Sequence, residues 1–221
     1  MPNLKKATSW LPGVSLMKTT TGGPEPIVQA ILVAGSYSTG QCMKGDPLIF
    51  VNVAATQSTL ITVASQIAGL TSPGAPPLYV AVAPSGAVAA AGVFGAGTPQ
   101  GLLGVAMNSA ALNGVVTVAL AVPENIFIIR GQNTYALNST TNNSIIPHST
   151  CDLYFQARQD GAASPFLGTL PCIYQGGAFT KNTLSVEGWV PGDDITDSTT
   201  PGRCYIRIVK AEIGVPVQTI P

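Results

Sequence analysis

His148 is the only histidine in this 221-residue sequence, so any Ser-His-Asp or Cys-His catalytic site would have to use it. It follows a proline in a polar segment, and no GxSxG nucleophile motif accompanies it. One histidine also excludes a zinc centre built from several histidines. We therefore predict an exposed loop histidine and no catalytic residues, with a hydrolase built around His148 as the alternative.

The densest acidic group is Asp193, Asp194 and Asp197, in the segment WVPGDDITDSTTPG. Carboxylates clustered on a loop could bind Ca²⁺, which takes several oxygen ligands. The spacing matches no calcium-binding loop, so the sequence favours an acidic turn between a strand that ends at Val190 and one that begins at Arg203. We expect neither a metal ion nor a cofactor.

Four cysteines form no CxxC or Cys/His ligand pair, which argues against a zinc site. Isolated buried thiols are the favoured interpretation, although spacing alone leaves disulfide pairing open. The four residues are Cys42, Cys151, Cys172 and Cys204.

Two further groups of side chains could contact a partner. A glycan-binding domain needs an exposed aromatic cluster, and the candidates are Trp189 with Tyr174 or Tyr205. Arginines could form ion pairs with a neighbouring subunit, although ordinary solvated strand faces explain them slightly better. These arginines are Arg130, Arg203 and Arg207.

The chain that must position these side chains contains few charged residues. Hydrophobic residues make up 46% of the chain and charged residues only 9%, with ten basic residues balancing ten acidic ones. No charged residue occurs between Pro47 and Pro123. Such a span must be buried in the core, against other chains or in lipid. Because a charge-poor surface favours association, we expect a homo-oligomer.

The same composition argues against nucleic acid and membrane partners. The Lys and Arg residues are scattered, whereas phosphate binding needs a clustered positive patch. The longest apolar run, residues 78–96, is interrupted by Pro84, Gly92 and Gly95 and lacks basic flanks, unlike a transmembrane helix.

Short strand patterns separated by 24 Gly and 18 Pro dominate the chain, and helical periodicity is almost absent. The sequence predicts an all-β sandwich or barrel with an extended N-terminal arm, and leaves a second small β-domain open. The expected units are an arm at residues 1–26, an uncharged barrel or sandwich domain at 27–135, and a second β region at 136–221.

Individual strands are expected in the uncharged span and beyond it. They are predicted at residues 27–35, 48–54 and 59–64, and as two Ala/Gly-rich strands within 78–96. One short helix could precede Pro73. In CDLYFQARQ, alternation places Cys151, Leu153 and Phe155 on a buried face and Asp152, Tyr154, Gln156 and Arg158 on an exposed one. RCYIRIVK alternates in the same way.

Residues 101–121, GLLGVAMNSAALNGVVTVALA, predict a hairpin with Asn113-Gly114 at its turn. This segment resembles head decoration, or cement, proteins of tailed bacteriophages. In that pattern a strand ending in GVA, here 104–106, is followed by an Ala-rich turn, here 108–113. A G-x-V-T-V strand, here 114–118, completes it.

The resemblance implies a β-rich virion protein that binds the outside of an assembled icosahedral head and stabilises it. Its expected partners are the major capsid protein and further copies of itself, most often in a trimer. It would be made in the host cytoplasm and located on the capsid surface. No catalytic residue is carried over.

Two other functions remain open from the sequence. The chain could be a β-sandwich coat protein that forms the shell itself. It could also be a glycan-binding, adhesive β-domain of a tail or surface structure.

Overall fold

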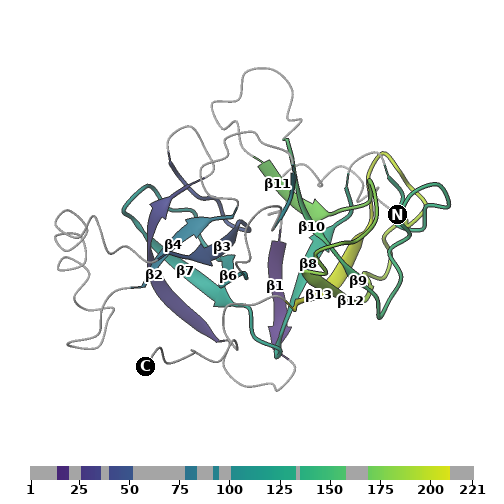
Figure 1. Ribbon diagram of the computed structural model, residues 1–221. Helices are drawn as coiled ribbons and strands as arrows, with labels where there is room; N and C mark the ends of the chain where they lie inside the picture. The colour runs from purple at the N-terminus through teal and green to yellow at the C-terminus, as the bar shows by residue number, and fades with distance from the viewer. Residues whose placement is uncertain are drawn as a thin grey trace, which may run out of the picture.

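The computed structural model of the protein describes residues 14–19, 26–35, 40–51, 78–83, 92–94, 101–132, 135–157 and 169–209. These residues form thirteen β-strands, and none of them lies in a helix. The all-β class predicted from the sequence is therefore confirmed. The strands make a closed barrel, a five-stranded sheet and a three-stranded sheet (Figure 1).

The barrel is built from five strands in the order β2-β4-β3-β6-β7. Their bounds are β2 (Ile27–Ala34), β3 (Pro47–Phe50), β4 (Tyr79–Val82), β6 (Gly104–Ala106) and β7 (Val115–Leu120). The β2–β4 pair is parallel and the other barrel pairs are antiparallel. Aliphatic and other small side chains fill its interior, because a five-stranded barrel leaves room for few large ones. They include Leu32, Leu48, Val80, Val82, Val116 and Val118.

The β6–β7 hairpin coincides with the segment that resembles decoration proteins. A Cβ atom on Gly104 would lie 2.1 Å from the carbonyl oxygen of Ala119, so only glycine permits this close approach of the two strands. Asn108 closes the loop, since its Oδ1 accepts the Thr117 N–H at 2.6 Å. Asn113 has a φ of 62°, the left-handed conformation that Asn tolerates at turns. The hairpin predicted from Asn113-Gly114 is confirmed.

The two open sheets lie beside the barrel (Figure 1). The five-stranded sheet has the order β1-β8-β13-β12-β9, and the three-stranded sheet has the order β11-β10-β5. An isolated bridge between Gly131 and Ile173 connects the end of β8 to β11. The bounds are β1 (Val14–Thr19), β5 (Gly92–Val93), β8 (Asn125–Arg130), β9 (Thr150–Cys151), β10 (Leu153–Ala157), β11 (Thr169–Ile173), β12 (Leu184–Trp189) and β13 (Arg203–Ile208).

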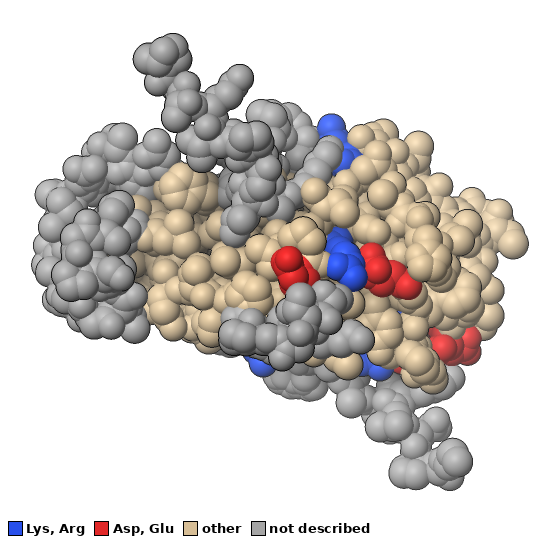
Figure 2. All heavy atoms as spheres, turned by 90° about the horizontal axis from the view of Figure 1, so that it is seen from below, with Lys and Arg blue, Asp and Glu red and all other residues tan. Residues whose placement is uncertain are grey.

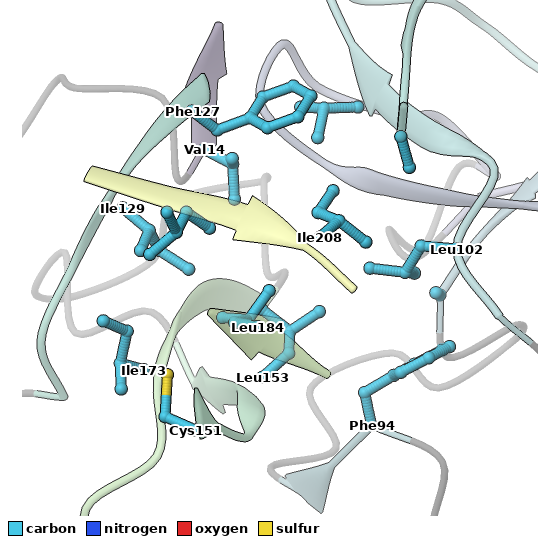
Figure 3. Packing of buried hydrophobic residues seen from close by; sticks show 14 of the residues in the cluster. Val14, Phe94, Leu102, Phe127, Ile129, Cys151, Leu153, Ile173, Leu184 and Ile208 are labelled. Atoms are coloured by element: carbon cyan, nitrogen blue, oxygen red, sulfur yellow. The ribbon is translucent and has the colours of Figure 1, made fainter. Parts of the chain in front are cut away.

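One hydrophobic core joins the barrel to both open sheets. On β3, Leu48 points into the barrel while the next residue, Ile49, packs outside it. Phe127 and Ile129 of β8 belong to the same outer cluster as Ile49. Figure 3 shows Phe127, Val14, Ile208 and Leu102 converging from different elements. β3, β4 and β6 are thus buried on both faces along most of their length, as the uncharged span predicts, whereas β2 and β7 keep one face partly exposed.

The sheets do not follow the unit boundaries expected from the sequence. β8 lies within residues 27–135, yet it pairs with β1 and with β13, which lie on either side of that range. β1 lies within the expected arm, but it is an edge strand of the five-stranded sheet. Its Val14 is 3% exposed and donates its N–H to the carbonyl of Gly45, in the turn before β3, at 3.2 Å. Residues 1–13 and 20–25 lie outside the described residues.

The two alternating strands differ from each other in burial. On β13, Cys204, Ile206 and Ile208 are buried and the residues between them are half-exposed, as predicted. The predicted exposed face of β10 needs correction, because Asp152 and Gln156 are buried and Tyr154 is only half-exposed. Neighbouring loops cover that face: the Asp152 carboxylate accepts hydrogen bonds from residues 180–182.

Other expectations concern residues that the structure does not describe. These are the strand at 59–64, the helix before Pro73 and Arg158. The strand expected at 48–54 is shorter, since β3 ends at Phe50 and Val51 lies outside it. No helix able to cross a membrane occurs in the part of the chain that is described.

Candidate functional site

The five strands of the barrel contain no Asp, Glu, Lys or Arg. Between Pro26 and Pro123 the sequence has only two charged residues, Lys44 and Asp46. Asp46 is buried, and its Oδ2 accepts the Met43 N–H at 2.8 Å. The strands of the five-stranded sheet, in contrast, include charged residues on β1, β8, β12 and β13. The charged residues of the strands therefore lie in the five-stranded sheet and not in the barrel.

Large apolar side chains are exposed on this uncharged barrel. Ile27 at the start of β2 is 47% exposed, Phe50 at the end of β3 is 43% exposed, and Leu112 in the β6–β7 loop is 47% exposed. In Figure 2 the red and blue residues lie over the middle and right of the face shown, and the described surface to their left, on the side where Figure 1 places the barrel, is tan. A surface with apolar groups and without charge is typical of a protein–protein contact. The barrel surface is the candidate functional site.

His148 occupies an exposed turn, as predicted. Its φ is 66°, and its backbone N–H donates to the Val186 carbonyl at 2.7 Å. Among the described residues, no hydrogen bond joins its imidazole to a carboxylate, a hydroxyl or a thiol. The backbone of His148 therefore joins its turn to β12.

The three clustered aspartates lie in the turn between β12 and β13, where the sequence predicts it. Each carboxylate faces nearby donors. Asp194 Oδ1 accepts both the N–H and the hydroxyl of Thr196, at 2.9 and 2.6 Å. Asp197 Oδ1 accepts the N–H groups of Thr199 and Thr200. Within the described residues, no group of three His, Cys, Asp or Glu side chains is arranged to hold a metal ion.

Asp193 forms a bidentate ion pair with Arg203. Its Oδ2 lies 2.8 Å from Nε and its Oδ1 lies 2.8 Å from Nη2 of the guanidinium, and Oδ2 also accepts the Arg203 N–H at 2.9 Å. These hydrogen bonds to Arg203 lower the pKa of Asp193, against the opposing effect of its partial burial. The pair fixes the position at which β13 begins.

Replacing Asp193 by Asn should lower the free energy of unfolding at neutral pH by about 1 kcal/mol or less, because water screens this half-exposed pair. Since the folded-state pKa is lowered, the stabilisation is complete above the unfolded-state pKa of about 3.9 and is lost as pH falls below it. Denaturant unfolding at pH 7 and near pH 2.5 measures the effect. An Asp193→Asn deficit that persists undiminished in acid would contradict this account.

The other two arginines also have partners within the chain. Arg207 Nε lies 3.2 Å from Glu187 Oε1, and its Nη1 donates to the Pro123 carbonyl. Arg130 is half-buried, and burial lowers its pKa, with a smaller opposing effect from nearby Cys172. Arg203 and Arg207 are thus engaged on their own subunit. The ordinary strand-face interpretation agrees with their geometry.

The aromatic residues singled out in the sequence do not form one surface. Trp189 is held by a hydrogen bond from its Nε1 to the Ile145 carbonyl at 2.9 Å. It pairs in register with Cys204, so the next residue on β13, Tyr205, faces the opposite side of the sheet. Tyr174 lies instead beside Tyr154, with ring centroids 5.2 Å apart. The fold therefore does not form the expected aromatic cluster around Trp189, and it brings Tyr174 together with Tyr154 instead.

All four cysteines are buried free thiols, which agrees with the preferred prediction. Burial raises the pKa of each thiol, to about 11 for Cys42 and to about 12 for Cys204. Burial likewise raises the pKa of Cys151 and Cys172. Because the reactive form is the thiolate, these side chains act as small core residues at neutral pH.

Asp152 is a structural residue that the alternation in the sequence wrongly placed on an exposed face. It is fully buried, and its carboxylate accepts three backbone N–H groups, from Thr180 at 2.9 Å, Lys181 at 2.8 Å and Asn182 at 2.6 Å. Successive amides of one turn thus enclose an anion. Its own carbonyl accepts the Tyr174 N–H at 2.9 Å. Asp152 therefore anchors the turn that leads into β12.

Comparisons of the chain with protein-family models, curated proteins and solved structures found no match.

Proposed function

We propose that this chain is a capsid decoration subunit of a tailed-bacteriophage head, which binds the outside of the assembled shell and stabilises it. It acts as a homo-oligomer, with a trimer as the expected form, and has no catalytic role. The major capsid protein is its partner, and the capsid surface is its location.

The observation that carries the proposal is the uncharged barrel with its exposed apolar residues. A monomer with such a surface would tend to self-associate, because no like charges keep copies apart. Burying apolar surface yields about 25 cal/mol per Å², so even a modest contact becomes large when it is repeated over a shell. The segment that resembles decoration proteins forms the β6–β7 hairpin of this barrel, and Leu112 is exposed on its loop.

The position of β1 limits the arm. Residues 14–19 of the expected arm belong to the five-stranded sheet, so this part of it packs within the fold. In this proposal, the part of the arm before β1 reaches a neighbouring subunit and pairs with a free strand edge. Removing residues 1–13 leaves β1 intact, whereas removing all of 1–26 would also remove Val14 from the core.

Binding to heads that lack this protein tests the proposal. Wild-type protein should saturate the heads at a fixed number of copies, measured by co-sedimentation. Leu112→Lys, which introduces a charge on the barrel loop, should weaken binding about tenfold or more, since a buried unpaired charge costs several kcal/mol. Deleting residues 1–13 should weaken it as well.

Ile146→Lys is the matched control, because Ile146 is also an exposed apolar residue, at 57%, but lies in the loop beside β12. It should bind like wild type. If wild-type protein fails to bind heads, the proposed function is wrong. If Leu112→Lys and Ile146→Lys bind equally well, the barrel is not the contact surface.

A further inference from the structure

Three tyrosines come together near the end of the three-stranded sheet. Tyr154 lies on β10, Tyr174 follows β11, and Tyr135 lies in the loop after β8. The rings of Tyr154 and Tyr174 have centroids 5.2 Å apart and planes inclined at 35°. Gln175, next to Tyr174, brings the loop of Tyr135 to this place, because its N–H donates to Gln132 Oε1 at 2.9 Å and its Nε2 donates to the Ala136 carbonyl at 2.8 Å. No barrel strand contributes to this group.

The backbone holds the Tyr174 ring in place. A Cβ atom on Gly177 would lie 3.0 Å from the phenol oxygen of Tyr174, and one on Gly176 would lie 3.2 Å from its Cε2. The two glycines therefore let the loop pass directly against the ring. The Tyr174 N–H is bonded to the carbonyl of buried Asp152. A ring that is fixed in this way loses little conformational entropy when a ligand contacts it.

The chemistry of the group combines apolar ring faces with neutral hydroxyls. All three side chains are half-exposed. Their phenol hydroxyls make no hydrogen bond to any residue that the structure describes. Partial burial, together with nearby Cys172, Tyr174 and Tyr135, raises the pKa of Tyr154, so its hydroxyl remains protonated at neutral pH. Tyrosine is suited to contacts that are apolar on one side and wet on the other.

We propose that Tyr135, Tyr154 and Tyr174 form a saccharide-binding surface. A pyranose ring presents a C–H face, which can lie on an aromatic ring, and hydroxyl groups, which can exchange hydrogen bonds with the phenols. The inference is independent of the capsid contact, which uses the barrel. It would give the protein a second function, attachment to a polysaccharide.

The test uses the full-length protein on an array of immobilised hexose and N-acetylhexosamine oligosaccharides, followed by titration of the best-bound oligosaccharide. We expect binding to one group of glycans. Tyr154→Ala should weaken it about tenfold through loss of the stacking contact. Tyr154→Phe should retain most of the affinity, and Tyr135→Ala, a change in a loop, should weaken binding without affecting the fold.

Tyr205→Ala is the matched control, because Tyr205 is another half-exposed tyrosine but lies on β13 of the other sheet. It should bind as wild type does. Silence of the whole array overturns the inference, as does binding that both Tyr154→Ala and Tyr135→Ala leave unchanged. Thermal melts of each variant separate a loss of affinity from a loss of fold. Neither result bears on binding to heads.

Discussion

Replacing Asp152 by alanine should lower the free energy of unfolding by about 3–5 kcal/mol, because the three N–H groups of residues 180–182 would lose the buried carboxylate that accepts their hydrogen bonds. Asp152→Asn should also be strongly destabilising. An amide NH₂ group would replace one carboxylate oxygen and face donors, where only acceptors fit. Denaturant unfolding at neutral pH measures both variants.

Asp194→Ala provides the control for Asp152. Asp194 is also a carboxylate that accepts backbone hydrogen bonds in a turn, but its bonds are exposed, so its loss should cost about 1 kcal/mol or less. Equal destabilisation by the two alanine variants would mean that the turn at 180–182 does not depend on the buried carboxylate. The account of how β12 is positioned would then be wrong.

Replacing Phe127 by alanine should lower the free energy of unfolding by about 3–5 kcal/mol, because it removes one of the largest fully buried side chains. Phe127 belongs to the core cluster that contains residues of the barrel and of both sheets. We therefore expect the whole molecule to unfold in one transition, which shifts as a unit in the variant.

Two local probes distinguish this result from independent unfolding. In a Trp10→Phe background, the fluorescence of Trp189 reports on the five-stranded sheet, and hydrogen exchange at the amides of Val116 and Val118 reports on the barrel. Leu32→Ala, in the barrel interior, is the control, and it should move both probes together as well. Two separate transitions, with Phe127→Ala shifting only the fluorescence, would show that the barrel and the sheets are independent units.

Features that depend on local chemistry could be predicted from the sequence. Asn113-Gly114 marked the β6–β7 hairpin, and the alternation in RCYIRIVK identified the buried face of β13. The lack of charge from Pro47 to Pro123 predicted strands covered on both faces, which holds for β3, β4 and β6 but not for β7, whose outer face is half-exposed. These predictions succeeded because turn type and the alternation of side chains along a strand depend on only a few neighbouring residues.

Features that depend on contacts between distant segments could not be predicted. The alternation that placed Asp152 toward solvent was correct about its side of the strand, but residues 180–182 cover that side. The aromatic cluster was expected around Trp189, yet pairing of β10 with β11 brings Tyr154 to Tyr174. The pairing of β1 with β8 joins residues more than a hundred positions apart, for which local patterns carry no signal.

A reconstruction of the DNA-filled head tests the proposed function most directly. The account predicts density for the barrel and its two sheets on the outer surface of the shell, grouped around local symmetry axes, with the Leu112 loop of the barrel facing the major capsid protein. Heads without such external density would contradict it. So would a shell whose continuous wall is built from this chain, since the protein would then be the coat subunit.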